Sequence, residues 1–268
     1  MPTVRSLTAA DIRAALGVGI DDFRAAPAYG FVFGGIYAIG GLMLIAAVTR
    51  LSMPWLAYPL AAGFALIGPF VAVGLYEVSR RLAAREPLSF GSIFGVIFAQ
   101  RGRELAWMAF VTLFVFLIWM YQVRVLLALF LGLRSFASFS GFLEAVFTTP
   151  EGLLFLAIGH VVGAALSLLV FSITVVSIPL LLDRDVDFIT AMITSVKAVA
   201  TSPVPMLGWG IVVAVSLLVA SLPMFVGLVV VLPVLGHTTW HLYKRVVEPA
   251  APAPESRPDP APDPAAAI

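Results

Sequence analysis

The sequence predicts an all-α fold: a polytopic membrane helical bundle of about six transmembrane helices, with two or three amphipathic interfacial helices. Of its 268 residues, 61% are hydrophobic and only 12% are charged, and the mean hydropathy is +1.04. A soluble domain carries about a quarter charged residues, so cytosolic enzyme folds are excluded. At about 20 residues per span, the apolar stretches have room for roughly five to seven transmembrane helices.

The N-terminal segment, residues 1–28, is expected to form a short amphipathic helix on the cytoplasmic surface of the membrane. Thr8 and Asp11 stand three residues apart ahead of an apolar run, which is the spacing of a capping box at the start of a helix. We expect this helix to end near Gly17 to Gly19. The many charges of the segment are not typical of a secretory signal, so no cleaved signal is predicted.

The first span is expected at about Tyr29–Val48. Small residues recur along it at spacings of four, four and three, which leaves one face of the helix without bulky side chains. Another helix can pack closely against such a face. We therefore assign a helix-packing role to Gly30, Gly34, Ala38 and Gly41.

The second span is expected at about Trp55–Glu77, with a kink near Pro69. A third span is expected at about Leu105–Leu133, and Arg124 marks its exit from the membrane. Between them, residues 89–100 place apolar side chains at i, i+3, i+4, i+7 and i+8. This pattern predicts an amphipathic helix at the interface.

A short helix around Phe142–Phe147 precedes the fourth span, at about Leu153–Leu182. A charged cluster and a second amphipathic helix, over residues 188–199, follow this span. The same order of elements occurs earlier in the chain, and Phe90 corresponds to Phe188 at an offset of about one hundred residues. This internal pseudo-repeat predicts two halves related by a twofold axis along the membrane normal.

The last apolar block, Met206–Gly236, contains Pro223 near its middle and is either one kinked helix or a hairpin of two. With a hairpin, both termini share a side that holds thirteen of the sixteen Lys and Arg residues, a strong positive-inside signal. The remaining three are Arg50, Arg124 and Arg134. The sequence therefore favours six spans within a transmembrane domain of residues 29–247, with both termini in the cytoplasm.

Residues 248–268 are rich in proline and alanine and contain no aromatic residue. This composition predicts a disordered tail, because the segment cannot bury enough apolar surface to fold. The absence of cysteine excludes disulfides, thiolate zinc sites, iron–sulfur ligation and cysteine nucleophiles. Glycine-rich nucleotide loops, Ser–His–Asp spacings and basic nucleic-acid patches are not seen. We therefore assign no catalytic residue, cofactor or metal, and expect no nucleic-acid partner.

Three segments carry a family resemblance: GPFVAVGLYEVSRRL at 68–82, IPLLLDRDVDFITAMITSVKAV at 178–199 and VVLPVLGHTTWHLYKRVV at 230–247. Over most of residues 10–247 the chain resembles a mainly proteobacterial family of integral membrane proteins of unknown function, some of whose members are labelled cytochrome c oxidase subunits. The resemblance implies a location in the bacterial inner membrane but no reaction. Three histidines are too few for a haem–copper catalytic subunit.

Two charged groups near the cytoplasmic ends of spans form a candidate polar cluster. Glu77, Arg80 and Arg81 are spaced for ion pairs on the second helix, and Asp183 and Asp185 occupy the matching end of the fourth. We expect the two groups to face each other and lock the helices. The acidic run lacks the glycine and glutamate that a calcium loop requires.

The histidine pair, His237 and His241, belongs to the same candidate cluster. The two residues stand four apart, so both imidazoles lie on one helix face, as in zinc sites with an H-E-x-x-H motif. No glutamate lies between them, and the preferred interpretation is an aromatic and basic interface belt. Metal or haem ligation and a contact with a headgroup or partner are the alternatives.

Two further polar residues fall within predicted spans. His160 is expected to hydrogen-bond across a close helix contact, with a proton or ligand role as the alternative. Arg124 is expected to extend its charged end to the outer interface, and the alternative is that it lines a polar cavity for an anion.

The shortage of buried polar groups, the small-residue face and the surface helices favour a non-catalytic scaffold, accessory or assembly factor for a membrane complex, a respiratory complex included. Its expected partners are the lipid bilayer and another membrane protein or a second copy of the chain. A transporter or channel for a small solute or ion is the first alternative, supported by the pseudo-repeat and the proline-broken helices. An intramembrane metal-dependent enzyme is the second.

Overall fold

The computed structural model describes residues 2–49, 57–100, 104–132 and 139–248, and every regular element within these ranges is a helix. The all-α prediction is therefore confirmed for the described part of the chain. The predicted start of the second span at Trp55, the arginines at 50 and 134, and the proline-rich tail beyond residue 248 lie outside the described residues.

The helices follow one another with short connections. In chain order they are α1 (Ala9–Ala25), α2 (Pro27–Thr49), α3 (Ala57–Ala84), α4 (Phe90–Gln100), α5 (Glu104–Phe130), α6 (Phe139–Thr148), α7 (Pro150–Thr174), α8 (Ser177–Asp183), α9 (Phe188–Thr201), α10 (Pro203–Ser221) and α11 (Leu228–Val246).

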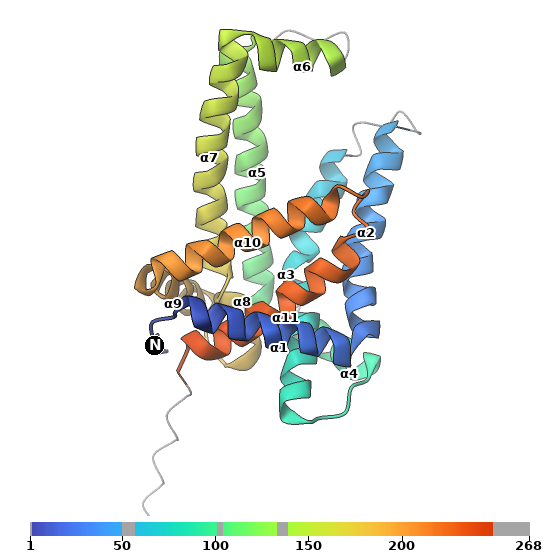
Figure 1. Ribbon diagram of the computed structural model, residues 1–268, viewed down its shortest axis with the longest axis vertical. Coiled ribbons are helices and arrows are strands. Elements are labelled where there is room, and N and C mark those ends of the chain that lie inside the picture. Colours follow the sequence, from blue (N-terminus) through green and yellow to red (C-terminus); the bar gives the residue numbers. More distant parts are fainter. Residues whose placement is uncertain (1, 50–56, 101–103, 133–138, 249–268) are drawn as a thin grey trace, which may run out of the picture.

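The arrangement has a compact body and a projecting hairpin (Figure 1). Helices α5 and α7 stand side by side and rise well beyond the other elements, and α6 lies across their far end. Helices α10 and α11 run across the direction of this hairpin, and α1 lies along α11. The first and last helices of the fold are therefore neighbours.

Four segments of the described chain are long and apolar enough to cross a membrane: Pro27–Ala46, Glu104–Phe130, Pro150–Asp183 and Pro203–Ser221. A count of six would add α3 and α11, and it stays a prediction. Of the two alternatives for Met206–Gly236, the described structure has two helices, because α10 ends at Ser221 and α11 begins at Leu228. Of these two helices, α10 is one of the four candidate spans and α11 is not.

Helix α1 extends further than its sequence indicates. The capping box is present, since the Thr8 side chain accepts a hydrogen bond from the Asp11 backbone and the Asp11 side chain accepts one from Thr8. The end expected near Gly17 to Gly19 is wrong, because the helix continues to Ala25. A Cβ at Gly19 would lie 2.7 Å from the backbone nitrogen of Thr238 in α11. This glycine permits a close helix contact, and the contact outweighs the weak helix propensity of glycine.

The predicted fourth span is divided in two, with α7 ending at Thr174 and α8 beginning at Ser177. Pro179 explains the break, because proline lacks a backbone N–H and its ring clashes with the carbonyl four residues earlier, that of Val175. The Val176 N–H, left without a helical partner, donates to the Ser195 hydroxyl of α9 at 3.1 Å. The break is thus stabilised by a neighbouring helix.

The small residues of α2 lie against α1, α11 and the turn that precedes α11. A Cβ at Gly34 would lie 2.8 Å from the Leu228 carbonyl oxygen and from the Val229 Cα, and one at Gly30 would meet the Phe23 ring. Similarly, Gly41 lies against the ring of Phe225. Ala38, on the same face, is buried. Close approach of the two backbones therefore depends on this face.

The core forms around α11, which contacts α1, α2, α3, α8 and α10. Trp240 and Tyr243 are fully buried, and the Trp240 ring stacks on that of Tyr76 in α3. His237 and Thr238, one turn earlier, have no exposed surface at all. Polar and aromatic residues of the last helix are therefore enclosed by the helices that come before it.

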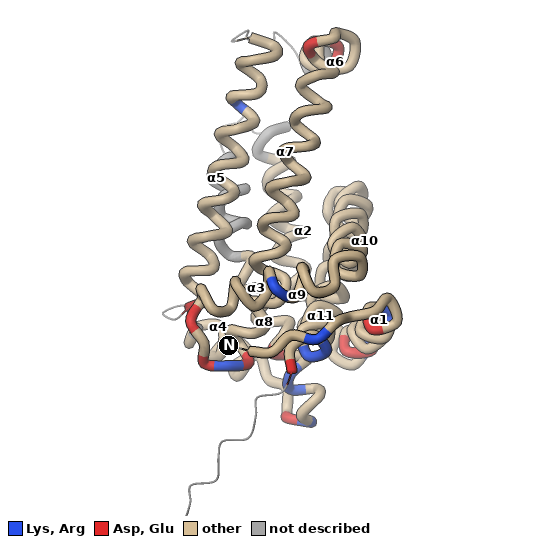
Figure 2. The backbone as a smooth tube through the Cα atoms, turned by 90° about the vertical axis from the view of Figure 1, so that its left-hand side faces the viewer, with Lys and Arg blue, Asp and Glu red and all other residues tan. Residues whose placement is uncertain are grey.

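Basic residues gather at one end of the molecule, where α1, the end of α3 and the end of α11 lie, and acidic residues lie both there and at α6 on the opposite end (Figure 2). On the long α5–α7 hairpin, basic charge appears at Arg124, far from that end. The segregation of charge anticipated from the sequence is thus present in the described fold, whereas the assignment of that end to the cytoplasm stays a prediction.

The packing of α2 on α11 predicts that Gly34→Ala destabilises the fold, because the added methyl group would meet backbone atoms that cannot move independently. Overpacking of this kind costs about 2 kcal/mol. Gly35→Ala is the matched control, since a Cβ at Gly35 meets nothing within 4 Å. Thermal unfolding in detergent, followed by tryptophan fluorescence, should show a lower midpoint for Gly34→Ala alone.

The start of α1 predicts a pH-dependent contribution to stability. Hydrogen bonds from Thr8 lower the pKa of Asp11 below its ordinary value of 3.8. A carboxylate with a lowered pKa stabilises the fold above that ordinary value, and the stabilisation is lost as the pH falls through the lowered one. Asp11→Asn should cost about 1 kcal/mol at neutral pH, and its difference from the wild type should shrink in unfolding measurements below about pH 3.8. A difference that persists in acid would contradict this account, and Asp21→Asn, an exposed acid of the same helix, provides the control.

Candidate functional site

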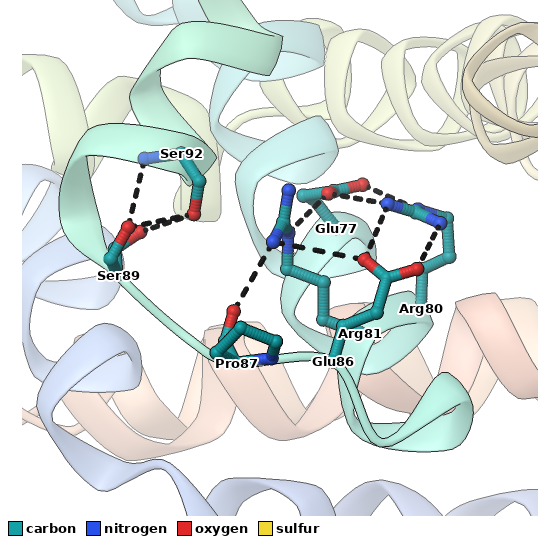
Figure 3. A network of polar contacts seen from close by, with 7 residues as sticks. All are labelled: Glu77, Arg80, Arg81, Glu86, Pro87, Ser89 and Ser92. Atoms are coloured by element: carbon teal, nitrogen blue, oxygen red, sulfur yellow. Dashed lines mark hydrogen bonds and ion pairs between the residues drawn. The ribbon is translucent and has the colours of Figure 1, made fainter.

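Glu77 forms the most buried ionic group of the described structure, with a side chain 1% exposed. Arg80 donates to both of its carboxylate oxygens, at 2.7 and 2.9 Å, and the Arg81 Nε donates at 2.6 Å (Figure 3). The partners stand three and four residues from the carboxylate, so one turn of α3 positions all three. The spacing anticipated from the sequence corresponds to direct contacts here.

The loop after α3 is attached to the same group. Glu86 accepts from the Arg80 guanidinium at 3.3 Å, and the Arg81 Nη1 donates to the carbonyl oxygen of Pro87 at 3.2 Å (Figure 3). Two arginines thus connect a buried carboxylate to the loop that leads into α4. Because their donors bind the protein itself, the group fixes the end of α3 and the entry to the next helix.

Asp183 has partners of its own on α11. Its carboxylate accepts from the Tyr243 hydroxyl at 2.5 Å and from the Lys244 ammonium at 3.1 Å. Asp185 lies in the exposed link between α8 and α9. The predicted cluster is therefore divided, with Glu77 bound to arginines of its own helix and Asp183 bound to the last helix.

The two histidines of α11 bind different helices. The Nδ1 of His237 lies 2.8 Å from the Ser79 hydroxyl of α3, and both residues are fully buried. One turn on, the Nε2 of His241 lies 2.7 Å from a carboxylate oxygen of Asp22 in α1. The pair therefore connects α11 to two helices from distant parts of the chain. Within the described residues, no group of three or more His, Cys, Asp or Glu side chains is placed to hold a metal ion.

Two further polar anchors hold the surface elements. The Leu7 N–H donates to the Ser202 hydroxyl at 2.7 Å, and the Phe188 N–H donates to the Glu104 carboxylate at 2.9 Å. Sequence reasoning did not identify these residues, nor Asp22 and Ser79, as partners. The sequence did contain a signal for the start of α9, because Asp187 precedes an apolar run and aspartate is a preferred N-cap residue. The Asp187 side chain caps α9 by accepting a hydrogen bond from the Thr190 N–H at 2.8 Å. This hydrogen bond lowers the pKa of Asp187.

His160 and Arg124 lie on the projecting hairpin, away from the anchors of α11. Arg124 is exposed on α5. The Nδ1 of His160 lies 2.7 Å from the Leu156 carbonyl oxygen of its own helix, so this nitrogen is the donor. Between α5 and α7, a largely apolar groove of about 440 Å³ is lined by both His160 and Gln122. The hydrogen bond expected for His160 is made within α7, not across a helix contact.

Residues 57–183, from α3 to α8, match a family model described as predicted integral membrane protein (DUF2189). No curated protein and no solved structure matches the chain. The match and the apolar helices together support an integral, multi-pass membrane protein. The matched stretch contains Glu77 with its two arginines as well as the α5–α7 hairpin, whereas α1 and α11 lie outside it.

The burial of Glu77 predicts a large cost for Glu77→Gln, because two arginines would lose the carboxylate that neutralises them. Removing one partner from a buried ion pair costs about 3 kcal/mol. The matched control is Glu86→Gln, which contacts the same arginines but is 39% exposed and should cost less than about 1 kcal/mol. Chemical unfolding in detergent measures both, and equal losses for the two variants would contradict the structural role assigned to Glu77.

Proposed function

We propose that the chain is a non-catalytic scaffold or assembly factor for a membrane complex. The observation that supports this proposal is that its polar side chains are bound to other groups of the same protein. Carboxylates, imidazoles and guanidinium groups that could serve a reaction bind other side chains of the protein, within α3 and between α11 and helices α1, α3 and α8. Side chains bound in this way hold helices in position, so the polar contacts at the charged end stabilise the fold.

The projecting hairpin supplies the complementary half of the proposal. Only 6% of the residues in the most apolar stretch of α5 are buried within the chain. At the charged end, by contrast, the polar side chains are bound to one another. A rigid base with a long exposed pair of helices suits a protein that presents a surface to other membrane components. Helix association in a bilayer depends on close packing and interhelical hydrogen bonds, not on burial from water, and the hairpin offers both small residues and polar side chains.

The segregation of charge supports an orientation with both termini in the cytoplasm of a bacterial cell. The charged end carries α1 and the last turn of α11, with Lys244 and Arg245 (Figure 2). Basic residues concentrate on the cytoplasmic side of inner-membrane proteins. The resemblance stated above makes a respiratory complex the first candidate for the assembly.

Orientation can be tested directly because the chain contains no cysteine. Arg13→Cys on α1 should react with a membrane-impermeant maleimide only in inside-out vesicles, and Glu144→Cys on α6 only in intact spheroplasts. The reverse pattern would place the charged end outside the cytoplasm. Labelling of both sites after detergent solubilisation controls for accessibility.

The scaffold role predicts that deleting the gene lowers the abundance of a specific membrane complex without abolishing a solute flux. Blue native electrophoresis with quantitative mass spectrometry of membranes from the deletion strain measures this, and respiratory complexes are examined first. Complementation with the wild type should restore the complex. Unchanged complexes, together with transport or turnover by the purified protein in liposomes, would contradict the proposal.

A further inference from the structure

The groove between α5 and α7 is lined by residues within 119–126 and 155–164, which belong to the second half of α5 and the N-terminal part of α7. These two helices form the hairpin that rises beyond the compact body (Figure 1). The lining of the groove includes Gly159 and Gly163, four residues apart on α7. A Cβ at Gly159 would meet nothing within 4 Å, and at Gly163 the nearest atom is the Trp119 Nε1 at 4.0 Å. In contrast to Gly34 of α2, these glycines allow close approach to a backbone that no helix of the described part of the chain covers.

The two polar side chains of the groove lie at similar depth. Gln122 is eight residues before the end of α5, and His160 is ten residues after the start of α7, which is about 12 and about 15 Å along the helix axes. Helix α7 has 25 residues and is about 38 Å long, against about 30 Å of hydrocarbon. Even with about 4 Å projecting at each end, both side chains fall within the hydrocarbon, where an unpaired polar group is costly.

The hydrogen-bonding character of each side chain follows from its contacts. Because a carbonyl oxygen only accepts, the Nδ1 of His160 carries the proton in its bond to Leu156. In the neutral ring the Nε2 is then an acceptor that needs an external donor. Gln122 also lines the groove and has no hydrogen-bond partner among the described residues. Its side-chain amide can donate through the NH₂ group and accept through the carbonyl oxygen. The groove thus combines a hydrogen-bond acceptor on His160, a donor on Gln122 and the uncovered backbone at Gly159 and Gly163.

We propose that this groove is the interface at which a second copy of the chain binds. A twofold dimer brings the same surface of both copies together, so the surface must complement itself. The Gln122 amide of each copy donates to the His160 Nε2 of the other, which makes two equivalent interhelical hydrogen bonds. The two α7 helices cross at Gly159 and Gly163, where small residues permit close packing. This inference concerns self-association and does not depend on which complex the protein assembles.

Oxidative cross-linking of single-cysteine variants in native membranes tests the dimer, since the unmodified chain has no cysteine to interfere. A disulfide needs Cα atoms within about 7 Å, so Gly159→Cys should cross-link and Ile211→Cys, on the 65% exposed face of α10, should not. Adding Gln122→Leu to Gly159→Cys should weaken association about tenfold, because two hydrogen bonds are lost.

A second measurement requires no substitution. Light scattering of the unmodified protein in a mild detergent should give a protein mass of twice 28.5 kDa. A mass of one chain, with lipid or a different protein in the groove, would overturn the proposal. So would cross-linking of Gly159→Cys no stronger than that of Ile211→Cys, or association that is unaffected by Gln122→Leu.

Discussion

The enclosure of α11 is the constraint on which the rest of the fold depends. Its second half carries two histidines, two threonines and a tyrosine in a protein that is otherwise strongly apolar. A helix of this kind cannot face lipid, because polar groups in hydrocarbon need partners. Helices α1, α2 and α3 therefore surround it. The Ser79 hydroxyl pairs with the His237 Nδ1 and the Asp22 carboxylate pairs with the His241 Nε2, while the His237 Nε2 is buried without a hydrogen-bond partner among the described residues. The glycines of α2 and Gly19 of α1 let these helices approach closely enough.

Local patterns in the sequence were sufficient for much of this architecture. The capping box of α1, the amphipathic helices α4 and α9, and the turn at Pro223 each depend on residues within a few positions of one another. The same is true of Glu77 and its arginines. What the sequence did not predict depends on distant residues: His241 binds a carboxylate 219 positions away, and His237 binds a hydroxyl 158 positions away. A periodic pattern in the sequence cannot identify such distant partners, because many other polar residues could have bound either histidine.

The two errors in the helix boundaries have different origins. Glycine was expected to end α1, but the packing of Gly19 on Thr238 gives that glycine a structural role inside the helix. The break before α8 was predictable from Pro179, yet the apolar run around it suggested a continuous span. In α1, a tertiary contact outweighed the weak helix propensity of glycine. Before α8, the high hydropathy of the segment concealed the helix-breaking effect of proline. The division of the candidate polar cluster is also due to a tertiary contact, because Asp183 accepts a hydrogen bond from Tyr243 of the last helix.

The contact between α1 and α11 also has a consequence for biosynthesis. The strand-like segment at Val4 pairs with Val247, and the backbone of Arg5 donates to the Val246 carbonyl oxygen at 2.9 Å. The ribosome makes α1 before α11, so α1 lacks its most extensive contact until α11 has been synthesised, although it also touches α2 and α3. The apolar face that α1 buries on α11 is uncovered during that interval, and a membrane surface can accommodate such a face. The final packing of α1 therefore follows the synthesis of α11.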